Sequence, residues 1–315
     1  MSIDLGGEIP VAEGSGRLVP AREEGALAPS PATGDGTAPR ARRRSVSPSY
    51  VAGLVMVGLV ALVGVVAIFW TPYDVSAGAA GTGGRLEGSS AQFWAGTDRL
   101  GRDLLSQLMG GATVAMTVAI ASVVIAGALG LAIGVVAAAT TRWADVALLN
   151  VIDLMIAFPT LLLAMLVVTV RGASLTSAIV AIGISGAAVI ARVTRVNAAR
   201  VLREDYVTAA TASGTGWWGT ILRHVLPNVA PTLLVQLMLL AGGAILAEAS
   251  LSYLGLGSPT ALSWGRLLSA AQKSVAVQPL GAILPGLLIA WTVLGLNLLG
   301  DGIRERTDPS LRGDR

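Results

Sequence analysis

The stretch EDYVTAATASGTGWWGTILRHVLPN, residues 204–228, is polar and yet lies between two of the most apolar segments of the chain. Its first two residues, Glu204 and Asp205, are acidic, and negative charge stabilises the amino end of a helix. Gly214, near the middle, can adopt the left-handed backbone conformation that commonly ends a helix. These features predict a short helix over residues 206–213.

A second helix is predicted directly after it, over Trp217–Val225. Its apolar stripe comprises Ile221, Leu222 and Val225. Pro227 and Pro231 follow where the next apolar segment begins, a position at which proline is tolerated. A small helix would thus be joined rigidly to a long apolar one. That geometry suits docking into a groove of another protein, although an amphipathic loop on a membrane surface would have the same composition.

The composition as a whole is that of a membrane protein. Hydrophobic residues make up 53% of the 315 positions and charged residues only 13%, whereas about a quarter of the residues of a soluble domain are charged. There are no cysteines, which excludes disulfides, thiolate metal sites and cysteine nucleophiles. The net charge of +3 is small and gives no indication of a nucleic-acid partner, so we expect none.

Six segments are apolar enough to cross a bilayer, for which a helix needs about 20 residues. We therefore expect an all-α polytopic membrane protein with six transmembrane helices. The expected spans are Tyr50–Trp70, Thr113–Ala139, Leu148–Val170, Ala173–Ala191, Val229–Leu251 and Leu280–Leu299. Small residues let neighbouring helices approach closely, and we interpret five glycines within the spans as packing positions. They are Gly127, Gly130, Gly134, Gly242 and Gly243.

Lysine and arginine residues predict the orientation, because they are enriched in cytoplasmic loops. With the N-terminus inside, 16 of them fall on the inner side and six on the outer side. Ten against six remain when the long N-terminal segment is left out. We expect both termini, and with them residues 204–228, to face the cytoplasm of a bacterial cell, with the protein crossing its cytoplasmic membrane several times.

The chain divides into five parts on this basis. Residues 1–48 are poor in aliphatic side chains and are expected to form a disordered cytoplasmic tail. They precede a first transmembrane helix at 49–72 and an extracytoplasmic loop at 73–112. Within that loop, Asp103 could cap a helix at the outer membrane interface, or the segment could be a purely architectural elbow. A core of five transmembrane helices at 113–300 would contain a cytoplasmic loop at 192–228, and residues 301–315 would form a second cytoplasmic tail.

Five motifs carry a resemblance to a known family. The pattern Ala209-Ala210, Gly214, Ile221 and Leu226-Pro227 resembles the EAA loop of ABC importer permeases, with Thr208 in place of the family's Glu. Four further motifs are GTDRLGRDLLSQLMGG (96–111), DLMIAFPTLLLAM (153–165), AEASLSYLGLGSPTALSWGRLL (247–268) and NLLGDGIRERTDP (297–309). On these motifs the chain is identified as a member of the dipeptide/oligopeptide/nickel permease group, C-type subunit, with the fold of the small ABC importer permeases.

The resemblance implies partners and a coupling site. The EAA loop of the family forms a coupling helix that seats in a cleft of the ATP-binding subunit. The residues to which this role transfers are Asp205, Tyr206, Ala209, Ala210, Gly214, Trp217, His224 and Pro227. The implied partners are a second, B-type permease, two ATP-binding subunits that hold ATP and Mg, an extracytoplasmic substrate-binding protein and the lipid membrane.

The lysine content agrees with an external energy source. A phosphate-binding loop of the GxxxxGK[ST] type needs a lysine, and the single lysine of the chain is Lys273, on the expected outer side. Energy would then arrive from another polypeptide. We expect no catalytic residue, no cofactor and no metal in this chain, because one histidine without cysteines does not build a metal site.

Polar residues within the spans are the remaining candidates for function, since ionisable groups in a bilayer usually face a protein interior or a water-filled path. Glu248 could meet a substrate amine, or it could hold the following turn by accepting backbone hydrogen bonds. Asp153 is close enough to the cytoplasmic face to pair with an arginine. Asn297 is polar but uncharged.

Several functions remain open from the sequence. A permease subunit for di- or oligopeptides fits best, with nickel or another small solute of the same family as an alternative. A secondary transporter that works without ATP is a different class, but such proteins place coupling carboxylates near the membrane midplane, whereas Asp153 and Glu248 are expected nearer the ends of their spans. A scaffold without transport would leave the cytoplasmic helix–turn–helix unexplained.

Overall fold

A computed structural model describes residues 47–74 and 81–307 of the chain. All described residues belong to one compact unit of the chain. The tail expected at residues 1–48 therefore lies almost entirely outside the described residues, and so does the end of the C-terminal tail, residues 308–315.

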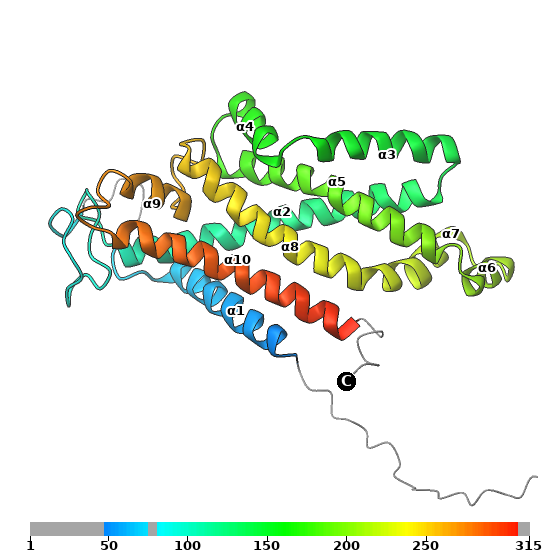
Figure 1. The fold of residues 1–315 in the computed structure, drawn as a ribbon, viewed down its shortest axis with the longest axis horizontal. Helices are drawn as coiled ribbons and strands as arrows, with labels where there is room; N and C mark the ends of the chain where they lie inside the picture. Colours follow the sequence, from blue (N-terminus) through cyan, green and yellow to red (C-terminus); the bar gives the residue numbers. More distant parts are fainter. Residues whose placement is uncertain (1–46, 75–80, 308–315) are drawn as a thin grey trace, which may run out of the picture. The chain divides into compact units, whose positions relative to one another are not determined.

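The described residues form a helical bundle (Figure 1). Its elements are α1 (Pro48–Phe69), α2 (Leu104–Ala139), α3 (Arg142–Ala157), α4 (Thr160–Arg171), α5 (Leu175–Val201), α6 (Asp205–Ala212), α7 (Trp217–Thr220), η1 (Ile221–Val225), α8 (Leu226–Tyr253), α9 (Trp264–Ala271) and α10 (Leu280–Thr307). Within residues 47–74 and 81–307, five helices are long and apolar enough to cross a membrane, and a bent pair raises the number to six if it counts as one span. The expectation of an all-α polytopic protein is confirmed.

The third expected span, Leu148–Val170, is not one straight helix. The chain bends by 85° between α3 and α4, at Phe158 and Pro159. Proline has no backbone N–H and disfavours a helical conformation in the residue before it, and Phe158 is accordingly extended, with ψ of 122°. The motif FP in the sequence thus breaks the span that its hydropathy predicts as continuous.

The helix expected at the outer interface is also different in the structure. Asp103 does cap a helix, and its carboxylate accepts a hydrogen bond from the Ser106 backbone N–H at 2.7 Å, but this helix is the 36-residue α2 itself. At 1.5 Å per residue α2 is about 54 Å long, well beyond the roughly 30 Å of hydrocarbon. Leu104 and Leu108 are buried in the protein rather than resting on lipid, so the prediction of a separate interfacial helix was wrong.

The expected cytoplasmic loop at 192–228 is largely helical. Helix α5 continues to Val201, ten residues beyond the predicted end of its span. Arg192 and Arg195 follow that predicted end and form ion pairs with α3. Charged residues that extend a helix out of the apolar region are not separated from it by hydropathy alone.

The glycines of α2 allow its close packing on α5. A Cβ atom at Gly130 would lie 2.5 Å from the Ile190 Cβ, and one at Gly134 would lie 2.5 Å from the Thr194 Cβ. These two positions confirm the expected packing role. Gly127 has ordinary space around it, and a Cβ at Gly243 would meet nothing within 4 Å.

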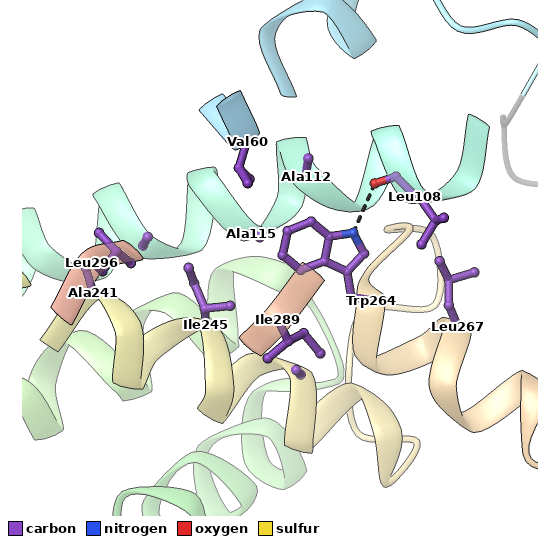
Figure 2. Close-up of a cluster of buried hydrophobic side chains, with 12 residues drawn as sticks. Val60, Leu108, Ala112, Ala115, Ala241, Ile245, Trp264, Leu267, Ile289 and Leu296 are labelled. Atoms are coloured by element: carbon purple, nitrogen blue, oxygen red, sulfur yellow. Dashed lines mark hydrogen bonds between the residues drawn. The ribbon is translucent and has the colours of Figure 1, made fainter. Parts of the chain in front are cut away.

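A buried apolar cluster joins α1, α2, α8, α9 and α10 (Figure 2). Its largest member is Trp264 of α9, whose side chain is 2% exposed and whose indole N–H donates to the Leu108 carbonyl of α2 at 3.0 Å. Gly111 makes room for the indole, because a Cβ there would lie 2.3 Å from the Trp264 Cδ1. Val60 of α1 and Ile289 of α10 close the cluster.

The ends of α1 and α10 meet at one end of the bundle (Figure 1). The Arg306 guanidinium lies over the Tyr50 ring, 3.8 Å from its centroid, and the Ser47 hydroxyl donates to the Glu305 carboxylate. Helices α6 and α7 project from this same end, and the loop 81–103 and α9 lie at the opposite end. The fold therefore places the helix–turn–helix and the beginning and end of the described bundle on one side.

Candidate functional site

Helix α6 ends in a glycine turn. Gly214 has φ of +92°, its N–H donates to the Thr211 carbonyl at 3.0 Å, and the N–H of Thr215 donates to the Ala210 carbonyl at 3.1 Å. This pair of bonds is the Schellman motif, which satisfies helix carbonyls by means of a residue in the left-handed region. The helix end predicted at Gly214 is confirmed, and a residue with a side chain would be strained at this position.

Most side chains of α6 are exposed. Val207 is the one fully buried residue of the helix, at 2% exposure, whereas Asp205, Tyr206 and Ala209 are exposed and Ala210 is half-buried. Small side chains leave the helix backbone accessible to another surface. The helix is held at one point and otherwise presented outward, which is the geometry that a docking element needs.

A polar contact fastens α6 to the beginning of α8. The Asn228 side-chain amide donates to the Tyr206 hydroxyl at 3.2 Å and to the His224 carbonyl at 2.7 Å. The Tyr206 ring also meets the His224 ring edge-on, with centroids 5.9 Å apart. His224 thus packs within the helix–turn–helix. Asn228 was not singled out in the sequence, where only its spacing of four residues from His224 could have indicated it.

Helices α7, η1 and α8 continue one into the next and anchor the helix–turn–helix in the bundle. Ile221, Val225, Val229 and Leu233 are buried and pack against Ile190 and neighbouring residues of α2 and α5. The segment η1 has the wider π-helical winding, which in other proteins is often found at functional sites.

Not every residue of the expected apolar stripe is buried. Leu222 is 58% exposed. The neighbouring Trp217 and Trp218 are also exposed, at 46% and 70%. Pro227 lies in the first turn of α8, as expected, and Pro231 lies inside that helix. The exposed tryptophans leave an aromatic surface beside α6.

Two ion pairs join α5 to α3 near the same end. Asp153 pairs with Arg192, with 3.0 Å between a carboxylate oxygen and a guanidinium nitrogen, as the sequence led us to expect. Asp145 pairs with Arg195 through two hydrogen bonds, one of them at 3.0 Å from the Arg195 Nε. Two parallel bonds fix a guanidinium firmly, so the second pair orients α3 on α5 more strictly than the first.

A hollow of about 460 Å³ lies where α5 turns into α6. Arg195, Arg200 and Arg203 line it together with Glu204 and Asp205. The first acidic residues of α6 thus stand next to a group of arginines, and any partner that docks on α6 meets a surface with both signs of charge.

Glu248 lies in α8 and is 5% exposed. It does not hold the following turn through backbone hydrogen bonds, which was one of its two interpretations. Its carboxyl group accepts a hydrogen bond from the Ser252 hydroxyl at 2.6 Å. It also forms a hydrogen bond with the side chain of Ser263, just before α9. Glu248 thus joins α8 to the α9 segment through two hydroxyl groups. Asn297, in α10, is half-buried beside Gly242 of α8.

Comparison with known proteins gives the family. The model of the binding-protein-dependent transport system inner membrane component matches residues 130–313, which include every element from the end of α2 to α10. The chain belongs to this family. It is a permease, a non-catalytic subunit of an ABC importer in the dipeptide and glutathione group, as the five sequence motifs predicted.

Several curated permeases are similar over most of their length. The dipeptide transport system permease protein DppC of Alkalihalophilus pseudofirmus is 35% identical over 82% of this chain and 86% of the relative. The glutathione permease GsiD of Pectobacterium atrosepticum is 36% identical, and the di/tripeptide permease DppC of Pseudomonas aeruginosa is 39% identical, each over 72% of this chain and 75% of the relative. A crystal structure of an amino acid ABC transporter with histidines is 15% identical, with a TM-score of 0.49, over 64% of this chain and 94% of that one.

Membership has three consequences. The permease is a multi-pass inner-membrane protein, its transport depends on a binding protein, and its complex includes an ATPase. An ATP-independent secondary transporter, which the sequence alone left open, is a different class and is overturned by the family match.

Proposed function

We propose that this permease forms half of the translocation pathway of an importer for di- and oligopeptides. Relatives that are 35–39% identical are named for dipeptides, di/tripeptides and glutathione, all of which are short peptide-like solutes. Nickel, the alternative from the sequence, has less support, since none of these three relatives is named for a metal ion. The second half of the pathway would be a B-type permease.

The observation that carries the mechanism is the exposed helix α6, clamped to α8 by Tyr206, His224 and Asn228. A cleft of an ATP-binding subunit receives α6 in this proposal. Two such subunits bind ATP and Mg and close on each other. The closure pushes α6, and the continuous α7–η1–α8 segment transmits the push into the membrane. Asp205, Ala209, Ala210, Gly214 and Trp217 would provide the contact surface, with Pro227 at the start of the transmitting helix.

This mechanism requires α6 to be cytoplasmic, and both chain termini with it. The charge near α6 supports this placement, because arginine is enriched in cytoplasmic loops. The chain carries four arginines shortly before α6, namely Arg192, Arg195, Arg200 and Arg203. The external binding protein would dock at the opposite end, around the loop 81–103 and α9.

The experiment has two steps. The chain is purified in detergent from its native membrane, and the co-purifying proteins are identified. We expect a second permease, two ATP-binding subunits and a binding protein. The complex is then reconstituted in liposomes with ATP inside, and uptake of radiolabelled dialanine and of ⁶³Ni²⁺ is measured. ATP-dependent uptake of dialanine supports the proposal. Uptake of nickel without dialanine would refute the peptide assignment, and recovery of the chain without any ATPase would refute the coupling mechanism.

A further inference from the structure

A cavity of about 720 Å³ opens at the end of the permease opposite α6. It lies between the loop 81–103, the N-terminal turns of α2, and the segment from the end of α8 to the beginning of α10. Its volume falls within the range typical of small-molecule sites, about 300–1,000 Å³. Neither the coupling mechanism nor the family match assigns it a ligand.

The lining of the cavity is rich in positive charge. The basic residues that line it are Arg85, Arg99, Arg102, Arg266 and Lys273, and Asp98 is the single acidic residue of the lining. Asp98 is already paired with Arg102 at 2.7 Å. The side chains of Arg99 and Lys273 form no hydrogen bond or ion pair with another part of the described chain. The cavity lining therefore has an excess of positive charge, and a carboxylate is the ligand group that complements it.

A buried carboxyl group lies behind another part of the lining. Ser252 and Ser263 line the cavity, and both are bonded to Glu248. Glu248 has no basic partner among the described residues, although an unpaired ionisable group in a membrane protein is costly and usually serves a function. Ser252 and Ser263 thus stand between the cavity and a buried carboxyl group, and hydroxyl oxygens at the cavity wall can accept a hydrogen bond from a cationic or N–H donor group.

Gln107 also lines the cavity, beside Asp98 and Arg102. Its Nε2 donates towards three acceptors, Asp98 Oδ2 at 3.3 Å, the Asp103 carbonyl at 3.2 Å and the Arg102 carbonyl at 3.5 Å. Its Oε1 is buried and accepts no hydrogen bond from the described chain.

We infer that this cavity is a substrate site of the permease itself, which binds the two charged ends of a short peptide. The peptide carboxylate lies at Arg99 and Lys273, and its ammonium group lies towards Ser252 and Ser263 in front of Glu248. The inference rests on the proposed function, since it takes a peptide as the transported solute. It adds a site on the permease that binds the substrate after the binding protein has released it.

The test measures direct binding to the purified transporter complex in lipid nanodiscs, without the binding protein. Radiolabelled dialanine is the probe, and dialanine amide and N-acetyldialanine are competitors that lack one charge each. The unmodified complex should bind dialanine at least about tenfold more tightly than either competitor, as expected for loss of one charge-assisted bond. The double variant Arg99→Ala/Lys273→Ala should lose the preference over the amide.

Glu248→Gln should lose the preference over the acetylated peptide and keep the preference over the amide. Ser252→Ala provides a second variant at the same place if Glu248→Gln does not fold. Arg171→Ala, at the C-terminus of α4 and outside the cavity lining, is the matched control for loss of an arginine and should bind as the unmodified protein does.

Uptake into liposomes, with binding protein and ATP present, separates the two proposals. ATP-driven uptake of dialanine without any direct binding to the permease would overturn this inference and leave the proposed function standing. Absence of dialanine uptake would overturn the proposed function instead. Unchanged peptide binding in the double variant, with weaker binding of the binding protein, would also overturn the inference, because the cations would then serve protein docking.

Discussion

Gly214 ends α6 because it can adopt a left-handed backbone conformation. Its φ of +92° closes the end of α6, and a Cβ there would meet nothing within 4 Å, so replacement by alanine strains the backbone without a clash. The strain is about 1–2 kcal/mol in the left-handed region, enough to unwind the last turn of a short exposed helix. We predict that Gly214→Ala keeps the permease in the membrane but lowers peptide uptake per ATP hydrolysed, measured in liposomes with the complete complex.

Gly216→Ala is the control for this substitution. Gly216 lies two residues further along, with φ of −66°, and a Cβ there also meets nothing within 4 Å. Uptake per ATP should stay unchanged in that variant. Equal effects of the two substitutions would contradict a specific role for the α6 turn.

Trp264 can be tested through its hydrogen bond alone. Trp264→Phe keeps an aromatic ring in the buried cluster but removes the donor to the Leu108 carbonyl. Loss of a buried hydrogen bond destabilises by about 1–3 kcal/mol, so we predict a lower unfolding temperature of the purified permease in detergent. Trp94→Phe is the control, because Trp94 is 74% exposed and donates to Ala91 at the surface; its unfolding temperature should not change.

Residue-level predictions from the sequence succeeded where the cause is local. Gly214 was predicted as a helix end because only its own backbone conformation decides it. Asp145 and Asn228 were not predicted as structural contacts, because their partners, Arg195 and Tyr206, lie 50 and 22 positions away. Contacts of this kind depend on how helices pack, which hydropathy does not specify.

At the scale of elements, the packing of α2 on α5 depends on two glycines in tight contact. We predict that Gly130→Ala destabilises the permease by about 1–3 kcal/mol, the usual effect of overpacking, because its Cβ would lie 2.5 Å from that of Ile190. Gly127→Ala, one turn earlier on α2, places its Cβ at an ordinary 3.5 Å from Leu237. The unfolding temperature in detergent should fall for the first variant only, and an equal fall for both would contradict the close packing.

The sequence predicted which segments are apolar and helical better than where each helix bends or ends. Each of the six expected spans overlaps a long apolar helix, or the bent pair α3–α4, among the described residues, because lipid requires apolar side chains throughout a span. Hydropathy did not predict the break at Pro159 or the continuation of α2 through Leu104, since neither changes the average polarity. The cavity at the end of the bundle opposite α6 was not predicted either. Arg99 and Lys273 are far apart in the sequence, and only the fold brings both into the lining of one cavity.

At the scale of the whole molecule, orientation in the membrane is the property on which the proposed coupling depends. The native chain has no cysteine, so a single introduced thiol reports one position only. Trp218, beside α6, and Trp94, in the outer loop, are similarly exposed, at 70% and 74%. In intact spheroplasts, a membrane-impermeant maleimide should label Trp94→Cys and not Trp218→Cys. After permeabilisation both should react, which controls for the reactivity of the two thiols. Labelling of Trp218→Cys in intact spheroplasts would place α6 outside, where no ATPase is available, and the coupling mechanism would fail with it.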